Sequence, residues 1–290
     1  MDFRQPFFME TLQTKLMRIV LHHPGDGFYM GTRFDRGGVF DSLEACGTEL
    51  CGRWFTSYDP LMHDAVCGPA EEFSPIKGPE EGTILKIGVG LLKDDGAPYD
   101  RFKLYEIIRP GSWSMENTGG SIVFRHTLEG FYDYRKEIAL TGESAFEIRH
   151  SLTACVPVEG EVYNHNFFTL GRMAVGPDRL IDLPFTPDGA WRAKYDSVGF
   201  TGSGVRFNRA LAPGESVYTG NIHKAGEEGM PYDITLREGR FAVHIRGDVP
   251  VSRTVLWANH RIACMEPYNN LSIRAGETFF WNIKYDITIL

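Results

Sequence analysis

Three features are scarce or missing in this chain of 290 residues, and each excludes a class of protein. The five cysteines are an odd number without Cys-x-x-Cys spacing, so we expect free thiols and neither a disulfide framework nor a zinc site. No apolar run reaches membrane-spanning length. The 30 basic residues are outnumbered by 38 acidic ones, and the net charge of -8 argues against nucleic acid or an anionic membrane as a partner.

The N-terminus also lacks the apolar core of a signal peptide. Between residues 9 and 21 the apolar positions are interrupted by Glu10, Lys15 and Arg18. Together with the unpaired cysteines, this pattern predicts a cytoplasmic protein.

Residues 1–24 are the one segment with a helical pattern. Leu12, Leu16 and Ile19 recur at roughly helical spacing, and a His-His-Pro sequence then ends the run. We therefore predict an N-terminal arm with helical character that packs on the outside of the protein. No low-complexity linker or internal repeat divides residues 25–290, so we expect one domain there.

From residue 25 onward the sequence is typical of short strands separated by turns. Hydrophobic residues make up 42% of the chain and aromatic residues 13%, which is enough for a sizeable core. Residues 121–126 and 146–152 are typical strand segments, and Gly and Pro pairs mark the turns between such segments. The sequence predicts an all-β protein. Residues 186–216 are polar, and we expect long cleft loops in that segment.

Two short motifs resemble cofactor or metal sites, but their spacing fits neither. Gly88 and Gly90 lie in an apolar run, residues 84–92, that lacks the third glycine and the following helix of a dinucleotide site, so we predict a strand there. His63 precedes several acidic residues at spacings that match no common metal-ligand pattern. We expect no cofactor and no metal. The loop that contains His63 and Glu72 is either solvated or binds sugar hydroxyls in a cleft.

One predicted strand carries the residues most typical of a functional site. On a strand, Tyr163, His165 and Phe167 share one face, and Asn164 and Asn166 share the other. A histidine between two aromatic rings is either a hydrogen-bonded structural residue or a proton-transfer group in a cleft. The apolar walls of such a cleft would suit a sugar ring.

Residues 165–170 (His-Asn-Phe-Phe-Thr-Leu) resemble the His-x-Tyr-Phe-Asn-Leu segment of the aldose 1-epimerases, or galactose mutarotases. The histidine of that segment is the family's catalytic acid, so the resemblance implies this role for His165. Phe167 and Thr169 stand where the family has Tyr and Asn.

A second resemblance concerns Glu266. By its residues alone, the apolar strand before Pro267 ends in a glutamate that is either solvated or, if desolvated, has the raised pKa useful in a general base. Residues 263–267 (Ala-Cys-Met-Glu-Pro), with Ala-Gly-Glu at 275–277, are similar to the family's Leu-Glu-x-Gln segment and its downstream Pro-Gly. The glutamate of that segment is the catalytic base, which implies this role for Glu266.

Shorter matches extend the resemblance across most of the chain. Residues 31–36 read Gly-Thr-Arg-Phe-Asp-Arg, where one branch of mutarotase-like proteins has Gly-Thr-Arg-Phe-Asp-Trp. The same branch has His-Asp-Ala and Glu-Glu-Phe runs like those that contain His63 and Glu72. The resemblance implies that Arg33, His63 and Glu72 position sugar hydroxyls. Trp257 would stack on the apolar face of the sugar.

The resemblance as a whole implies a large antiparallel β-sandwich of the mutarotase type, with a cleft across one sheet. It implies an isomerase in which Glu266 takes a proton from the anomeric hydroxyl, while His165, initially protonated, gives one to the ring oxygen. One alternative is an isomerase or lyase for a modified-sugar or non-sugar substrate, and another is a carbohydrate-binding protein without catalysis. We expect a carbohydrate or related polyol as the partner, and a monomer or homodimer.

Overall fold

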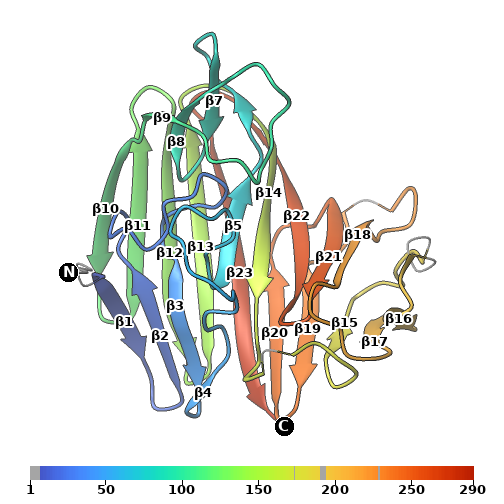
Figure 1. Ribbon diagram of the computed structural model, residues 1–290. Helices are drawn as coiled ribbons and strands as arrows, with labels where there is room; N and C mark the ends of the chain where they lie inside the picture. Colours follow the sequence, from blue (N-terminus) through green and yellow to red (C-terminus); the bar gives the residue numbers. More distant parts are fainter. Residues whose placement is uncertain (1–6, 173, 190–193, 228) are drawn as a thin grey trace.

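The computed structural model describes residues 7–172, 174–189, 194–227 and 229–290, and these residues form β-strands and no α-helix (Figure 1). The prediction of an all-β protein is confirmed. All pairings between the strands are antiparallel, and the strands form sheets of ten, five, four and four members.

Two large sheets contain most of the strands. In the order in which its strands lie side by side, the ten-stranded sheet consists of β10 (Ser112–Asn117), β11 (Ser121–Leu128), β12 (Tyr132–Gly142), β13 (Ala145–Ala154), β23 (Thr278–Ile289), β20 (Phe241–Gly247), β19 (Asp233–Glu238), β15 (Leu180–Asp182), β17 (Gly204–Phe207) and β16 (Val198–Thr201). In the same order, the five-stranded sheet consists of β18 (Ser216–Asn221), β21 (Arg253–Asn259), β22 (Ala263–Ile273), β14 (Val158–Phe167) and β5 (Gly68–Phe73).

Two four-stranded sheets complete the architecture. The first consists of β1 (Met9–Gln13), β2 (Met17–His22), β3 (Phe40–Ala45) and β4 (Thr48–Glu49). The second consists of β6 (Ile76–Lys77), β7 (Thr83–Lys86), β8 (Gly90–Lys93) and β9 (Ile107–Arg109), and it stands at the upper end of the molecule in Figure 1.

The core lies between the ten-stranded and the five-stranded sheets, which pack face to face as in a sandwich. Phe73 of β5 sets its ring edge-on against Tyr134 of β12 at 5.3 Å and against Trp281 of β23 at 6.1 Å. Burying a side chain of the size of Phe73 contributes about 1.5–3 kcal/mol. In the first four-stranded sheet, the ring of Phe40 on β3 contacts that of Phe146 on β13 at 6.0 Å, so this sheet also packs on the large one.

Side chains along β5 and β14 alternate between the core and an outer face of the five-stranded sheet. The carboxylate of Glu71 on β5 lies 3.1 Å from the imidazole of His150 on β13, and it accepts a hydrogen bond from Asn164 of β14 at 2.9 Å. Glu71 and Asn164 therefore face the core. Because successive strand residues point to opposite faces, Glu72 and His165 point outward. The two faces inferred from the sequence of β14 are those of the structure.

A buried ion-pair network joins the two large sheets. Lys136 of β12 forms ion pairs with Glu71 and, at 3.4 Å, with Asp35. Burial raises the pKa of Asp35 to about 6. Burial also acts to raise the pKa of Glu71, but the attraction of Lys136 and the hydrogen bond with His150 outweigh it and hold that pKa at about 2. Glu71 is therefore an ionised carboxylate inside the core that depends on its cationic partner.

The predicted helical character of the N-terminal arm is wrong for the residues that the structure describes. Residues 9–22 form the hairpin β1–β2, whose turn is closed by the hydrogen bond that the backbone N–H of Met17 donates to Thr14 Oγ1 at 2.9 Å. Met17, Ile19 and Leu21 recur with period two and are buried, and this strand pattern overrides the helical spacing. The first six residues lie outside the described part, and the division into an arm and one domain stays a prediction.

Two further expectations are corrected by the fold. Residues 84–92 form the hairpin β7–β8 and not one strand, because Gly88 turns the chain with a φ of +75° and a Cβ there would lie 2.5 Å from the carboxylate of Asp35. In the segment 186–216, the described residues include β16 and β17 at the edge of the large sheet, and none of them lines the cleft on the five-stranded sheet described below, while residues 190–193 lie outside the described part.

The expectation of free thiols is confirmed. All five cysteines are unpaired, with Cys46 and Cys155 exposed and the other three buried. Within the described ranges of the chain, no helix is long and apolar enough to cross a membrane.

We expect Lys136→Met to lower the free energy of unfolding by about 3–5 kcal/mol, because the variant keeps the length of the side chain but leaves buried carboxylates without their cation. Urea denaturation would measure this change. Lys93→Met is the matched control, since Lys93 pairs with Glu106 on the surface, where solvent screens both charges. Equal stabilities for the two variants would contradict the importance of the network.

Candidate active-site cleft

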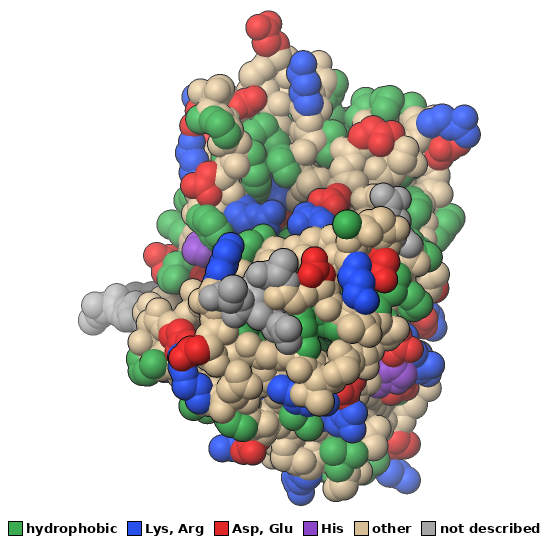
Figure 2. All heavy atoms as spheres, turned by 90° about the vertical axis from the view of Figure 1, so that its right-hand side faces the viewer, with side chains coloured by type: hydrophobic (Ala, Val, Ile, Leu, Met, Phe, Trp, Pro, Cys, Tyr) green, Lys and Arg blue, Asp and Glu red, His purple; other side chains and the backbone are tan. Residues whose placement is uncertain are grey.

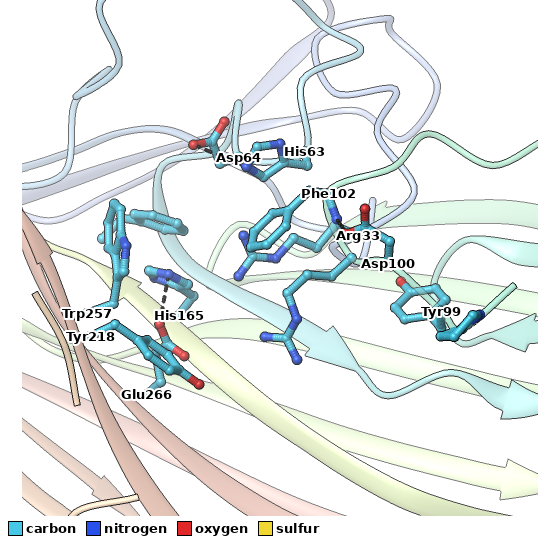
Figure 3. Close-up of a pocket in the computed structure, with 13 residues that line it drawn as sticks. Arg33, His63, Asp64, Tyr99, Asp100, Phe102, His165, Tyr218, Trp257 and Glu266 are labelled. Atoms are coloured by element: carbon cyan, nitrogen blue, oxygen red, sulfur yellow. Dashed lines mark hydrogen bonds and ion pairs between the residues drawn. The ribbon is translucent and has the colours of Figure 1, made fainter. Parts of the chain in front are cut away.

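A cleft of about 790 Å³ opens on the outer face of the five-stranded sheet (Figures 2 and 3). Side chains of β14, β21 and β22 line it together with loop residues near positions 63 and 100. Five of the six residues singled out from the sequence line this cleft, namely Arg33, His63, His165, Trp257 and Glu266. The fold therefore brings together residues that are as far apart in the chain as positions 33 and 266.

His165 and Glu266 contact each other in the floor of the cleft (Figure 3). Nε2 of His165 lies 3.1 Å from Oε1 of Glu266, and both side chains are at most 4% exposed. The contact joins neighbouring strands of one sheet, because β14 pairs with β22 up to Tyr163 and Tyr268, each two residues from the contacting pair. An imidazole N–H at Nε2 is a donor and a carboxylate oxygen an acceptor, so the two groups are complementary in this contact.

The environment of His165 is largely aromatic. Phe167 stacks on the imidazole at 3.8 Å, and Trp257 meets it edge-on at 5.4 Å. Burial lowers the pKa of His165, and the nearby Glu266 carboxylate counteracts this only in part. The neutral imidazole is thus the favoured form at neutral pH, whereas we expected a protonated one from the sequence; the reason is desolvation. Nδ1 of His165 is buried without a hydrogen-bond partner among the described residues.

Glu266 lies within β22 and not at a strand end as we inferred from Pro267. The neighbouring strands β14 and β21 both pair with β22 and carry it through the proline to Ile273. The hydroxyl of Tyr268 donates to Oε2 of Glu266 at 3.3 Å, while Oε1 contacts His165. Each carboxylate oxygen of Glu266 is therefore held by one neighbouring side chain. Tyr268 is a site residue that we did not identify from the sequence.

Glu72 lies beneath the cleft and does not line it. Its Oε2 accepts hydrogen bonds from Arg33 Nε at 2.5 Å and from the hydroxyl of Tyr163, and its Oε1 lies 3.7 Å from Lys86 Nζ and from Arg101 Nε. Burial acts to raise the pKa of Glu72, but the attraction of these three cations holds it at about 2. Because both oxygens are engaged and buried, Glu72 holds the basic side chains in place, and its contact with a sugar hydroxyl stays a prediction.

Arg101 and Lys86 complete the charged side of the site, and neither was among the site residues predicted from the sequence. Arg101 lines the cleft, and Lys86 is fully buried beneath it, where burial lowers its pKa to about 8. Neither residue belongs to a motif, and their common contact with Glu72 arises only when the chain folds. A single sequence contains no signal for this shared contact.

The rim of the cleft is formed by polar and aromatic side chains. The imidazole of His63 packs edge-on against Phe102 at 4.9 Å, and its Nε2 lies 3.6 Å from the carboxylate of Asp64. Burial lowers the pKa of His63, although the charge of Asp64 opposes this. Trp257 forms an apolar wall with Trp54, whose ring it meets at 5.6 Å. Among the described residues, no group of three or more His, Cys, Asp or Glu side chains could hold a metal ion.

Comparisons with known proteins bear on this arrangement. No protein-family model matches the sequence, and no curated protein matches it significantly. Solved structures do match. A putative aldose 1-epimerase from Escherichia coli K12 aligns with a TM-score of 0.60 and 13% identity, covering 98% of this chain and 100% of that one. An aldose epimerase homologue from C. elegans aligns with a TM-score of 0.58 and 12% identity, covering 98% and 100%. The chain has the galactose mutarotase-like fold.

The mutarotase-like sandwich that the resemblance implied is thereby confirmed. A galactose mutarotase related enzyme from Lactobacillus acidophilus gives a similar result, with a TM-score of 0.55, 13% identity and coverage of 98% of this chain and 97% of that chain. Likeness at this level of identity shows the fold, and one fold can carry different functions.

We expect Glu266→Gln to lower the pKa of His165 further, because the substitution removes the negative charge that stabilises the imidazolium. A titration of the imidazole by NMR would measure this pKa, and the value for the unaltered protein should lie below the ordinary 6.5. Glu161→Gln is the control, since Glu161 pairs with Arg253 and lines no cleft. A His165 pKa that rises in Glu266→Gln would contradict the described electrostatics.

Proposed function

We propose that this protein is an aldose 1-epimerase-like isomerase, which interconverts the α and β anomers of a sugar by general acid–base ring opening. The observation that carries the proposal is the contact between His165 and Glu266, 3.1 Å apart in the floor of the cleft. A carboxylate and an imidazole at one point supply a base and an acid to the same reacting centre. The reaction needs no cofactor.

The close contact of the two groups suits the geometry of the reaction. In a cyclic sugar, the anomeric hydroxyl and the ring oxygen are bonded to the same carbon. An acid and a base that lie side by side can therefore each reach one of these oxygens from the cleft. The rings of Phe167 and Trp257 exclude water from the side chain of His165, which strengthens electrostatic interactions between His165 and the reacting oxygens.

The reaction then proceeds by two proton transfers in each direction. The Glu266 carboxylate accepts the proton of the anomeric hydroxyl, the bond between the anomeric carbon and the ring oxygen breaks, and His165 as an imidazolium gives its proton to that oxygen. The product is the open-chain aldehyde, with Glu266 protonated and His165 neutral. Rotation about the bond next to the carbonyl exposes its other face, and the reverse transfers close the ring to the opposite anomer.

The protonation state of His165 limits this mechanism. The imidazolium is the minor form at neutral pH, because burial lowers the pKa of His165. The adjacent Glu266 carboxylate is the group that partly offsets this effect and keeps the acid form accessible. Tyr268 restrains the same carboxylate through a hydrogen bond at 3.3 Å, so the base stays oriented while its partner changes charge.

A second candidate function is sugar binding without catalysis. Phe102 and Tyr218 line the cleft and are 62% and 56% exposed, and such rings can stack on a sugar whether or not chemistry follows. For a binding protein, His165 and Glu266 would be dispensable while sugar affinity persisted.

Polarimetry of freshly dissolved α-anomers would test the proposal. With glucose, galactose and their 6-phosphates as the panel, we expect the protein to accelerate mutarotation of at least one sugar. We expect Glu266→Gln and His165→Ala each to reduce this acceleration about a hundredfold or more, the scale of general acid–base catalysis. Glu161→Gln, outside the cleft, should keep full activity. Unchanged acceleration in Glu266→Gln would contradict the proposal, and sugar binding without any acceleration would favour the binding protein.

A further inference from the structure

We propose that the sugar bound in this cleft carries an anionic group, either a carboxylate or a phosphate or sulfate ester, and that Arg101 binds this group. The inference rests on the proposed function, because it names the class of substrate for the same site.

The first observation is a local excess of positive charge. Arg33, Lys86 and Arg101 surround the single carboxylate of Glu72, so three positive charges face one negative charge. Figure 2 shows basic side chains gathered in a recess of this face of the molecule. Positive charge that is removed from water is costly unless it is paired. An anion delivered by a ligand would supply the missing partner.

The second observation is that Arg101 has hydrogen-bond donors left for a ligand. A guanidinium has five N–H donors. Arg33 is 7% exposed and directs its guanidinium to Glu72 and Tyr163. The side chain of Arg101 is 36% exposed, and its Nη1 donates to Tyr163 at 3.2 Å, with Tyr268 as a further partner. Its Nε lies 3.7 Å from Glu72, which is too far for a hydrogen bond.

The acidic residues of the cleft do not neutralise Arg101. Asp64 lies beside His63 in Figure 3, Asp100 forms no ion pair with Arg101, and Glu266 is engaged with His165. Among the described residues, Glu72 is the only carboxylate within 4.0 Å of the Arg101 guanidinium. The whole chain has a net charge of -8, but the cleft is locally positive at Arg101, whose side chain lines the cleft and is partly exposed.

The third observation is the position of Arg101 relative to the proposed reaction centre. Its guanidinium carbon lies 5.7 Å from the centre of the Tyr163 ring, and the Tyr163 and His165 rings are 6.2 Å apart. Both rings project from the same face of β14. A sugar whose anomeric carbon lies at His165 would extend across the Tyr163 position toward Arg101. The anionic group is thus expected on the side of the sugar ring remote from the anomeric carbon.

Isothermal titration calorimetry with glucose, glucuronate and glucose 6-phosphate, and with the three corresponding galactose compounds, would test this inference. We expect at least one acidic sugar to bind the unaltered protein about tenfold or more tightly than its neutral counterpart, which is the scale of a charged hydrogen bond. This preference should weaken as salt is added. Comparing the affinities of the carboxylate sugars with those of the sugar phosphates shows which of these two anions the cleft binds more tightly.

Substitution of the arginine then tests the role of Arg101 itself. Arg101→Gln should reduce the ratio of acidic-sugar to neutral-sugar affinity about tenfold, and Arg101→Lys should restore part of it, because lysine keeps the charge but not the planar fork. Arg149→Gln is the matched control, because Arg149 pairs with Glu147 and lines no cleft. Circular dichroism would verify that each variant is folded.

The outcomes separate this inference from the proposed function. If no acidic sugar binds more tightly than its neutral counterpart, or if Arg101→Gln leaves the ratio unchanged, the inference is overturned, whatever polarimetry shows. If acidic sugars bind through Arg101 but no sugar is mutarotated faster, the anion site stands and the proposed isomerase activity fails.

Discussion

The alternation of side chains along β5 is the constraint on which both the core and the cleft depend. Glu71 and Glu72 are consecutive, so the pleat of the strand directs one carboxylate into the core and the other beneath the cleft. Glu71 binds Lys136 of the large sheet, and Glu72 binds Arg33 and lies beside Arg101. The single strand β5 therefore supplies one carboxylate to the core of the sandwich and one to the basic side of the site. A shift of its register by one residue would reverse the faces to which the two carboxylates point.

The acid–base pair has a similar origin in the sheet. His165 and Glu266 come from neighbouring strands whose register is set by hydrogen bonds along β14 and β22, so no mobile loop is needed to bring them together. Different forces set the charge at the two ends of the cleft, because burial dominates for His165 while the attraction of nearby cations outweighs burial for Glu72. Burial lowers the pKa of His165 at one end, while the excess of cations at the other end keeps Glu72 ionised. A site on strands keeps such fixed charges preorganised.

Much of this architecture could be predicted from the sequence, because period-two alternation and turn residues are local signals. Resemblance of short motifs identified His165 and Glu266, whose contact the structure then revealed. The N-terminal hairpin was missed because a few apolar residues fit two periods at once, and the continuation of β22 was missed because Pro267 usually ends a strand. The cluster of cations around Glu72 had no sequence signal, since its members meet only through tertiary packing.

The central claim is that His165 and Glu266 act together on one anomeric centre. Exchange NMR with a sugar labelled at the anomeric carbon would measure the interconversion rate for His165→Ala, Glu266→Gln and the double variant. If the pair acts as a unit, the double variant should lose about as much rate as the worse single variant. Losses that multiply would contradict the claim, because the two residues would then act independently.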